Sequence, residues 1–181
     1  MKYVAFFRGI NVGGKNIVKM SELRQLFTDL GLQNVKTYIQ SGNVIFSSDT
    51  EQCSLVTMIE KAFEEKFGFN TTFTIRSEDE ITSIIDSLPF EAEEIEQARR
   101  EAPDVEHIYV YLSDSDIDKE KVVQLCSRYN GSDRVEIEES EIYLLCFQSI
   151  RDSKLAIMLS KLPQPLTFRN LNTMKKISMM F

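Results

Sequence analysis

A glycine-rich, basic segment near the amino terminus offers the most chemistry in this sequence. Residues 9–16 read GINVGGKN, and basic residues stand at both ends of the segment. Glycines free the backbone to turn its N–H groups toward one point, and the basic side chains add positive charge. The segment therefore predicts a site for an anionic or phosphorylated ligand. Its predicted contacts are Arg8, Asn11, Gly13, Gly14, Lys15, Asn16 and Lys19.

The same spacing, G-x-x-x-x-G-K, is that of the phosphate-binding loop of P-loop nucleotidases. In that loop a Ser or Thr follows the lysine and ligates magnesium, whereas Asn16 stands here. The helix should also begin at the lysine, and the pattern here predicts a start near Ser21. Neither a Walker-B acid nor a large parallel sheet is indicated, so we exclude this class of nucleotidase. The alternative to an anion site is a solvent loop whose glycines serve chain geometry.

Two other polar segments complete the candidate site. Residues 40–43 read QSGN, which is hairpin-turn chemistry because Gly and Asn tolerate positive φ. Near the other end, Asn170 is a predicted helix N-cap, and an exposed helix amino terminus beside Arg169 can bind an anion. An ordinary turn and an ordinary cap are the alternatives. The predicted ligand contacts from these segments are Gln40, Ser41, Asn43, Arg169 and Asn170.

The sequence gives little support for a metal site or for a catalytic cysteine or histidine. The cysteines are Cys53, Cys126 and Cys146; their odd number, long spacing and lack of a CxxC argue against a disulfide framework or a thiolate zinc site. We expect them to be small buried hydrophobes. A single histidine, His107, makes a two-histidine metal site impossible. Residues 114–118 resemble the start of an EF-hand loop, but a lysine replaces its glycine. We therefore predict no metal and no cofactor.

The charge of the chain is unevenly distributed. It has 181 residues, 43% hydrophobic and 27% charged, which is ordinary globular composition. The net charge is −7, yet residues 1–46 carry six basic and two acidic side chains, and residues 166–181 carry three basic and none acidic. This favours a local anion site over a general polyanion binder. The acidic total, with no evident aromatic stacking platform, weakens the case for nucleic acid.

The apolar runs are short and the amino terminus does not have the pattern of a signal peptide. The longest runs cannot span a bilayer, and residues 3–7 end at Arg8 with no small-residue cleavage site. We expect a cytoplasmic protein without a membrane partner.

The order of predicted elements indicates an α+β fold built from two similar halves. Residues 2–75 give the order β-α-β-β-α-β, and the same order repeats from Ile108. This order is that of the ferredoxin-like, split-βαβ arrangement. We predict two ferredoxin-like (βαββαβ) subdomains with antiparallel sheets, at 1–88 and 105–181. A helical connector covers 89–104, and a helix ends the chain.

This topology brings two of the polar segments together. Right-handed crossovers place the first and third strands side by side and antiparallel at the sheet centre. Arg8, at the end of the first strand, then neighbours Val44, at the start of the third. We therefore expect loop 9–19 and turn 41–43 at the same edge of the sheet.

These motifs also carry a resemblance. Residues 8–16, Met20 and residues 37–44 closely resemble the bacterial domain-of-unknown-function 1697 family, and residues 169–170 are similar to its carboxy-terminal motif. Leu171 stands where that family leads us to expect tryptophan, which removes an aromatic ring for stacking. The resemblance covers the chain end to end. It implies an α+β fold with ferredoxin-like subdomains and no established reaction.

Three functions follow from these residues. The first is metal-independent binding of an anionic small molecule or nucleotide, with short nucleic acid as the less supported partner. The second is a small enzyme for an anionic metabolite, in which Arg8 holds the substrate and Lys15 or Tyr38 transfers a proton. The third is a protein–protein module with the loop as its interface. The oligomeric state and the identity of the ligand are not predicted.

Overall fold

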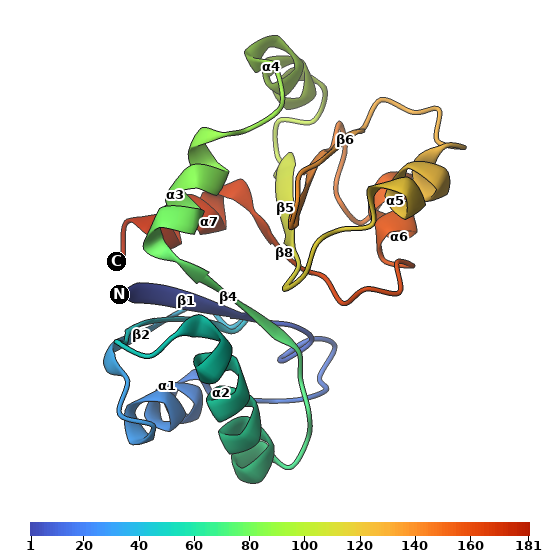
Figure 1. Cartoon of the computed structure of the whole chain (residues 1–181). Coiled ribbons are helices and arrows are strands. Elements are labelled where there is room, and N and C mark those ends of the chain that lie inside the picture. Colours follow the sequence, from blue (N-terminus) through green and yellow to red (C-terminus); the bar gives the residue numbers. More distant parts are fainter. The chain divides into compact units, whose positions relative to one another are not determined.

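The computed structural model describes residues 1–181, and the chain divides into two compact units (Figure 1). Unit 1 contains residues 1–84 together with 175–181, and unit 2 contains residues 85–174. The carboxy-terminal residues thus group with unit 1, whereas the sequence division placed them with the second subdomain. One contact inside unit 1 that holds them is the Lys36 Nζ donating to the Met180 carbonyl at 2.7 Å.

Unit 1 has the predicted order of elements. In chain order they are β1 (Lys2–Phe7), α1 (Met20–Asp29), β2 (Gln33–Tyr38), β3 (Asn43–Ser47), α2 (Gln52–Phe67), β4 (Phe73–Ser77) and α3 (Glu78–Asp86). The sheet order is β2-β3-β1-β4, and all neighbours are antiparallel. Strands β1 and β3 are central and adjacent, which confirms the topology predicted from the crossovers.

Local sequence signals set the helix ends in unit 1. Gly68 ends α2 with φ +74, and its N–H donates to the Glu64 carbonyl at 2.9 Å. At the start of α3, the Glu80 N–H donates to the Ser77 hydroxyl, and the Ser77 N–H donates to the Glu80 carboxylate at 2.7 Å. This reciprocal pair is a capping box, which satisfies two donors of the first turn.

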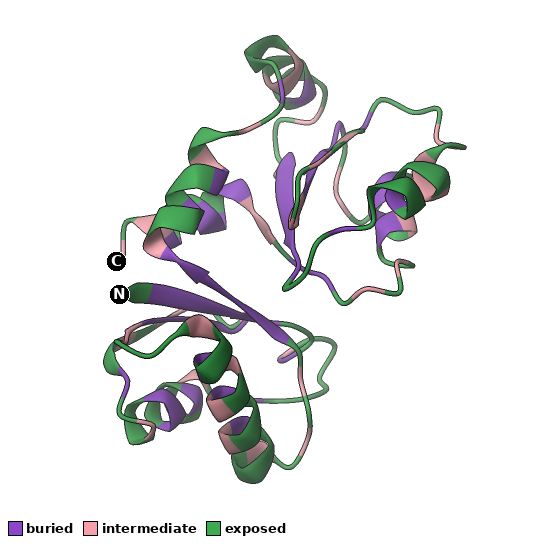
Figure 2. Ribbon diagram, in the orientation of Figure 1, coloured by how far each residue is buried: buried purple, intermediate pink, exposed green.

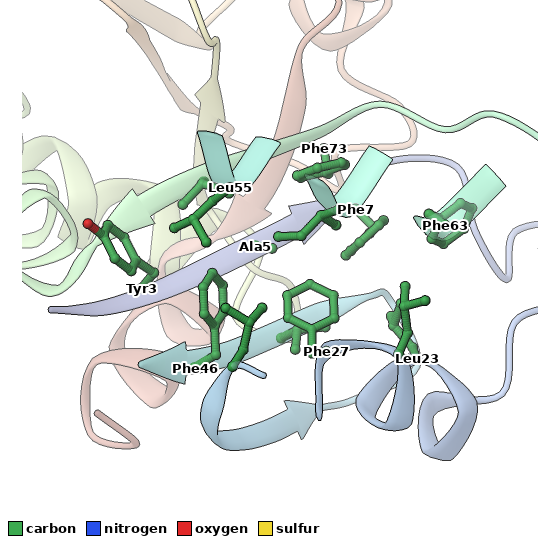
Figure 3. Close-up of a cluster of buried hydrophobic side chains, with 14 of the residues drawn as sticks. Tyr3, Ala5, Phe7, Leu23, Phe27, Phe46, Leu55, Phe63 and Phe73 are labelled. Carbon is green, nitrogen blue, oxygen red and sulfur yellow. The ribbon is translucent and has the colours of Figure 1, made fainter. Parts of the chain in front are cut away.

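Strand β1 is buried along almost its whole length (Figure 2). Tyr3, Ala5 and Phe7 belong to the core beneath α1 and α2 (Figure 3). The Phe7 ring stacks on Phe63 and Phe73 at centroid distances of 5.3 and 4.9 Å. Offset aromatic contacts of this kind add stability beyond burial alone. Strand β1, which ends at the candidate loop, is therefore held in place by packing in the core.

Unit 2 repeats the arrangement. Its elements are α4 (Ala92–Glu101), β5 (Ile108–Leu112), α5 (Lys119–Cys126), β6 (Arg134–Ile137), β7 (Glu141–Leu145), α6 (Lys154–Leu159), β8 (Thr167–Asn170) and the start of α7 (Leu171–Ser178). The sheet order is β6-β7-β5-β8, again antiparallel throughout. Two sheets with the same strand order confirm the α+β class with two ferredoxin-like subdomains.

A buried carboxylate holds part of unit 2 together. Asp133 Oδ1 accepts from the Phe147 N–H at 2.9 Å, and Oδ2 accepts from the Ser153 hydroxyl at 2.7 Å. Ser153 Oγ in turn accepts from the Ala156 N–H and caps α6. Asp133 therefore connects the start of β6 with the end of β7 and the start of α6.

The cysteines do not all have the expected environment. Cys146 is buried and Cys126 is half-buried, but Cys53 is exposed near the start of α2. The prediction of a buried small hydrophobe was wrong for Cys53, because α2 turns that position away from the core formed by Leu55, Ile59 and Phe63.

Candidate functional site

The loop after β1 and the turn before β3 lie next to each other in unit 1. Phe6 pairs with Asn43 in the sheet, and the Phe7 N–H donates to the Gly42 carbonyl at 2.8 Å. The Asn11 side-chain amide donates to the Gln40 carbonyl at 2.9 Å. These contacts confirm that segments about thirty positions apart in the sequence meet at one edge of the sheet.

Gly42 is required by packing as well as by backbone geometry. Its φ is +76, in the left-handed region that glycine adopts without strain. A Cβ at this position would lie 2.5 Å from Ile10 Cδ1 and 2.8 Å from Phe7 Cβ. Ile10 is itself buried, so the first residues of the loop press against the turn. The sequence indicated the positive φ here but not the close approach of Ile10.

Asn11 fixes the shape of the loop. Its Nδ2 donates to the carbonyls of Val18 and Gln40, both at 2.9 Å, and its Oδ1 accepts from the Val18 N–H at 2.8 Å. Its backbone N–H donates to the Asn16 carbonyl at 3.1 Å. Asn11 has φ +56, which asparagine tolerates better than most residues. Because its side-chain hydrogen bonds tie the loop's start to its end and to the turn, Asn11 is placed to organise the site.

The tip of the loop is a miniature hairpin. Val12 and Lys15 form an isolated antiparallel bridge, and the Lys15 N–H donates to the Val12 carbonyl at 3.1 Å. Gly13 and Gly14, between them, have φ +58 and +73, as in a type I′ turn. Helix α1 begins only at Met20. The loop therefore differs from a P-loop, as the sequence predicted, and it presents the two glycines and Lys15 at an exposed tip.

The basic side chains of the loop are exposed, and two of them have no carboxylate partner. Lys19 Nζ lies 3.4 Å from Glu22 Oε1 in a solvent-exposed pair, which has little energetic value. Arg8 and Lys15 form no ion pair with any acidic side chain. Positive charge is therefore available at this edge of unit 1.

The remaining predicted residues of unit 1 divide between scaffold and surface. Asn43 is buried, and its Nδ2 donates to the Tyr38 carbonyl at 2.9 Å and to the Ser41 hydroxyl at 3.0 Å. The Asn16 amide donates to the Gly9 carbonyl at 3.2 Å. Gln40 is exposed and Ser41 is half-buried. Asn16 and Asn43 thus support the loop and the turn, while the position of Gln40 suits direct contact with a ligand.

Exposed apolar side chains in the loop and beside the turn were not predicted from the sequence. Val12, Ile17 and Ile39 are exposed at 65%, 72% and 51%, and all three lie in the loop or beside the turn. Ile39 also has φ +50, a strained conformation for a β-branched residue. Strain of this kind persists where the surrounding structure imposes it, often at functional sites. The available signal was the presence of isoleucine and valine among the polar residues of the loop.

Arg169 and Asn170 belong to unit 2. Asn170 Oδ1 accepts from the Thr173 N–H at 2.7 Å, which confirms it as the N-cap of α7. Arg169 donates to the Phe168 carbonyl at 2.8 Å and to the Thr167 hydroxyl at 3.2 Å. Burial lowers the pKa of Arg169 to about 10, so it stays cationic at neutral pH. Ligand contact by these two residues remains a prediction.

Neither a metal site nor a reactive thiol stands out in the chain. No group of three or more His, Cys, Asp or Glu side chains is arranged to hold a metal ion. Burial, with a further contribution from Asp133, raises the pKa of the Cys146 thiol to about 12, so it is a thiol and not a thiolate at neutral pH. No helix is both long and apolar enough for a membrane span.

Comparison with known proteins agrees with this architecture. The conserved bacterial protein SP0830 from Streptococcus pneumoniae has a similar solved structure, with 30% sequence identity and a TM-score of 0.77. The match covers 99% of this chain and 97% of that one. A search of the curated proteins found no significant match. The family model described as "Protein of unknown function (DUF1697)" matches residues 1–143, and the chain therefore belongs to the DUF1697 family.

Proposed function

We propose that unit 1 binds an anionic small molecule, in particular one carrying a phosphoryl group such as a nucleotide. The observation that carries this proposal is the pair of exposed cations, Arg8 and Lys15, beside a loop that Asn11 holds in one shape. Neither cation has a carboxylate partner. In this proposal the cations supply charge and the glycines at the hairpin tip supply backbone N–H donors.

The rigidity of the loop favours binding. A loop that is already ordered loses little conformational entropy when a ligand arrives, so more of the interaction energy remains as affinity. Hydrogen bonds from Gln40 and Ser41 would orient the ligand against the turn. Because the charges are exposed to solvent, salt should weaken the interaction strongly. Short nucleic acid is included in the proposal as the less supported ligand, and its affinity should fall most steeply with salt.

A protein–protein module is the second candidate, and the exposed apolar side chains favour it. Val12 and Ile17 are exposed in the same loop as Lys15, and Ile39 is exposed just before the turn. Apolar residues grouped with arginine are typical of interface centres. This candidate predicts an oligomer, or a bound protein partner, that is lost when residues 10–16 are deleted. Analytical ultracentrifugation of the full chain and of the deletion variant tests it.

A thermal-shift screen tests the anion-binding proposal. Nucleotides, sugar phosphates and oligonucleotides are added to the full chain at low salt and at 0.5 M salt. A ligand at one hundred times its dissociation constant adds about 2.7 kcal/mol to the free energy of unfolding. We expect stabilisation by at least one phosphorylated compound at low salt and its loss at high salt. A screen without stabilisation, or with salt-independent stabilisation, contradicts the proposal.

Replacing Lys15 separates a binding protein from an enzyme. In Lys15→Met a binding protein loses affinity, whereas an enzyme that uses Lys15 for proton transfer keeps some affinity and loses turnover. Lys61→Met is the matched control, because Lys61 is an exposed lysine on α2 whose pair with Glu65 is at 4.0 Å. Equal affinity in wild type, Lys15→Met and Lys61→Met would exclude a role for the hairpin tip.

The cytoplasmic location expected from the sequence is part of this proposal, since intracellular metabolites are largely phosphorylated anions. Cell fractionation of the tagged full chain checks it.

A further inference from the structure

A third segment of unit 1, the connection from α2 to β4, meets the start of the candidate loop. The Arg8 N–H donates to the Thr72 carbonyl at 2.9 Å, and the Thr71 hydroxyl donates to the Arg8 carbonyl at 2.7 Å. Both backbone groups of Arg8 are therefore held by this connection. The site residues predicted from the sequence did not include Thr71 or Thr72.

The register of the sheet places the Arg8 and Thr72 side chains on the same face. Phe7 lies opposite Phe73 in the pairing of β1 with β4, and the hydrogen bond from Arg8 to Thr72 continues this register by one step. Phe7 and Phe73 both belong to the core beneath α1 and α2. Because successive side chains alternate between the two faces of a sheet, those of Arg8 and Thr72 both project from the opposite face. Residues directly opposite each other in an antiparallel pair have Cβ atoms about 4.5–5.5 Å apart, so these two side chains are neighbours.

Both side chains are available to a ligand. Arg8 and Thr72 are exposed, whereas Thr71 is half-buried. The Thr72 hydroxyl makes no hydrogen bond within the chain, and the Arg8 guanidinium has no carboxylate partner. A guanidinium donates to two oxygens in a fixed fork, and a hydroxyl donates to one more. Together these donors match the three free oxygens of a phosphomonoester, whereas a phosphodiester has only two.

We propose that the anion site of unit 1 extends to Thr72 and that it selects phosphomonoesters over phosphodiesters. This inference rests on the proposed function and adds one ligand contact and one positioning residue to it. The Arg8 guanidinium binds two oxygens of the terminal phosphoryl group, and the Thr72 hydroxyl donates to the third. Thr71 does not touch the ligand. Its hydroxyl holds the Arg8 carbonyl, which fixes the backbone from which the Arg8 side chain extends.

Amide chemical-shift titrations of the full chain at low salt test the contact, with methyl phosphate as the monoester and dimethyl phosphate as the diester. We expect the monoester to bind more tightly. Thr72→Val, which replaces the hydroxyl by a methyl group, should weaken methyl phosphate about tenfold, as loss of a charge-assisted hydrogen bond would, and leave dimethyl phosphate unchanged. The charge difference between the two compounds is the same for every variant, so a smaller preference for the monoester reports the hydroxyl.

Two control variants accompany this measurement. Thr72→Ser keeps a hydroxyl and should bind both compounds like the wild type. Thr57→Val changes an exposed threonine on α2 whose hydroxyl donates to the Cys53 carbonyl of its own helix at 3.4 Å, and it should leave both affinities unchanged.

A double-mutant cycle tests the positioning role of Thr71. Thr71→Val should weaken methyl phosphate about threefold to tenfold, as loss of one hydrogen bond would, whereas Thr71→Ser should bind like the wild type. In an Arg8→Gln background, Thr71→Val should have no further effect, because the side chain that Thr71 positions is absent. A general loosening of the loop would weaken binding equally in both backgrounds, so an effect of equal size would overturn the positioning role.

The outcomes separate this inference from the proposed function. If methyl phosphate does not bind to the wild-type chain, both are wrong. If it binds and the affinity is lost in Arg8→Gln with Lys15→Gln, but Thr72→Val keeps the wild-type preference for the monoester, the anion site stands and its extension to Thr72 is wrong.

Discussion

Replacing Gly42 by alanine is the substitution that probes the junction of loop and turn most directly. Gly42 lies in the turn before β3, and the added methyl group would meet Ile10 Cδ1 at 2.5 Å and Phe7 Cβ at 2.8 Å. Both neighbours are buried, and Phe7 is held between other aromatic rings. The new side chain therefore cannot be accommodated without moving the loop away from the turn.

The magnitude follows from two separate costs. A non-glycine residue in the left-handed region costs about 1–2 kcal/mol, since φ at Gly42 is +76. Inserting a methyl group into a packed core costs a further 1–3 kcal/mol, roughly. Gly68→Ala is the matched control, because Gly68 has φ +74 but nothing within 4 Å of the added Cβ. We expect Gly42→Ala to lower the free energy of unfolding by about 2–5 kcal/mol, and Gly68→Ala by only the first term of about 1–2 kcal/mol.

Urea denaturation of the full chain, followed by far-ultraviolet circular dichroism, measures both values. Gly42→Ala should also lower the affinity for any phosphorylated ligand found by the thermal-shift screen, whereas Gly68→Ala should leave that affinity unchanged. If the two variants lose the same stability, Ile10 does not press on the turn, and the structural basis of the site is wrong.

Three further substitutions have defined outcomes. Asn11→Ala should lower the free energy of unfolding by about 2–4 kcal/mol, because it removes three side-chain hydrogen bonds to backbone groups. Asn34→Ala, also at positive φ but with one bond of 3.3 Å, should lower it by about 1 kcal/mol in the same urea assay. Asp133→Asn should lower the free energy of unfolding by roughly 2–3 kcal/mol, because the new amide group faces either the Phe147 N–H or the Ser153 hydroxyl with a donor of its own. Asp152→Asn, at an exposed position, should leave the free energy of unfolding almost unchanged. Cys146 has a pKa raised to about 12 by burial, so the folded protein holds this proton longer than the unfolded chain and loses stability as pH rises from about 9 to about 12, at up to ~1.4 kcal/mol per pH unit. Cys146→Ala should make that alkaline slope shallower, and an unchanged slope would show that the thiol does not titrate there.

The sequence was most informative where local chemistry decides the structure. Gly68 ends α2, Asn170 caps α7, and the repeated element order predicted two sheets that both have the expected strand order. Helix capping and hydrophobic spacing act within a few residues, so a single sequence contains them. The meeting of loop 9–19 with turn 41–43 also followed, because crossover handedness fixes which strands are neighbours.

Features that depend on contacts between distant residues were not predictable. The three bonds from the Asn11 side chain to backbone groups, and the approach of Ile10 to Gly42, could not be predicted, because many sequences form the same turn. The sequence identified His107 as the only histidine and excluded a two-histidine metal site. The burial of its Nε2 without a hydrogen-bond partner, and the cavity that His107 lines, depend on packing between residues distant in the sequence. Neither could be read from spacing.

We propose that the hairpin tip and the adjoining turn form one cationic surface that receives a phosphoryl group. Amide chemical-shift mapping of the nitrogen-15-labelled chain with inorganic pyrophosphate at low salt tests it most directly. We predict saturable shifts confined to residues 8–19, 39–43 and 71–72, reduced at high salt and absent in the double variant Arg8→Gln with Lys15→Gln. Shifts located elsewhere in the chain, or shifts of the same size in the double variant, would show that this surface does not bind the phosphoryl group.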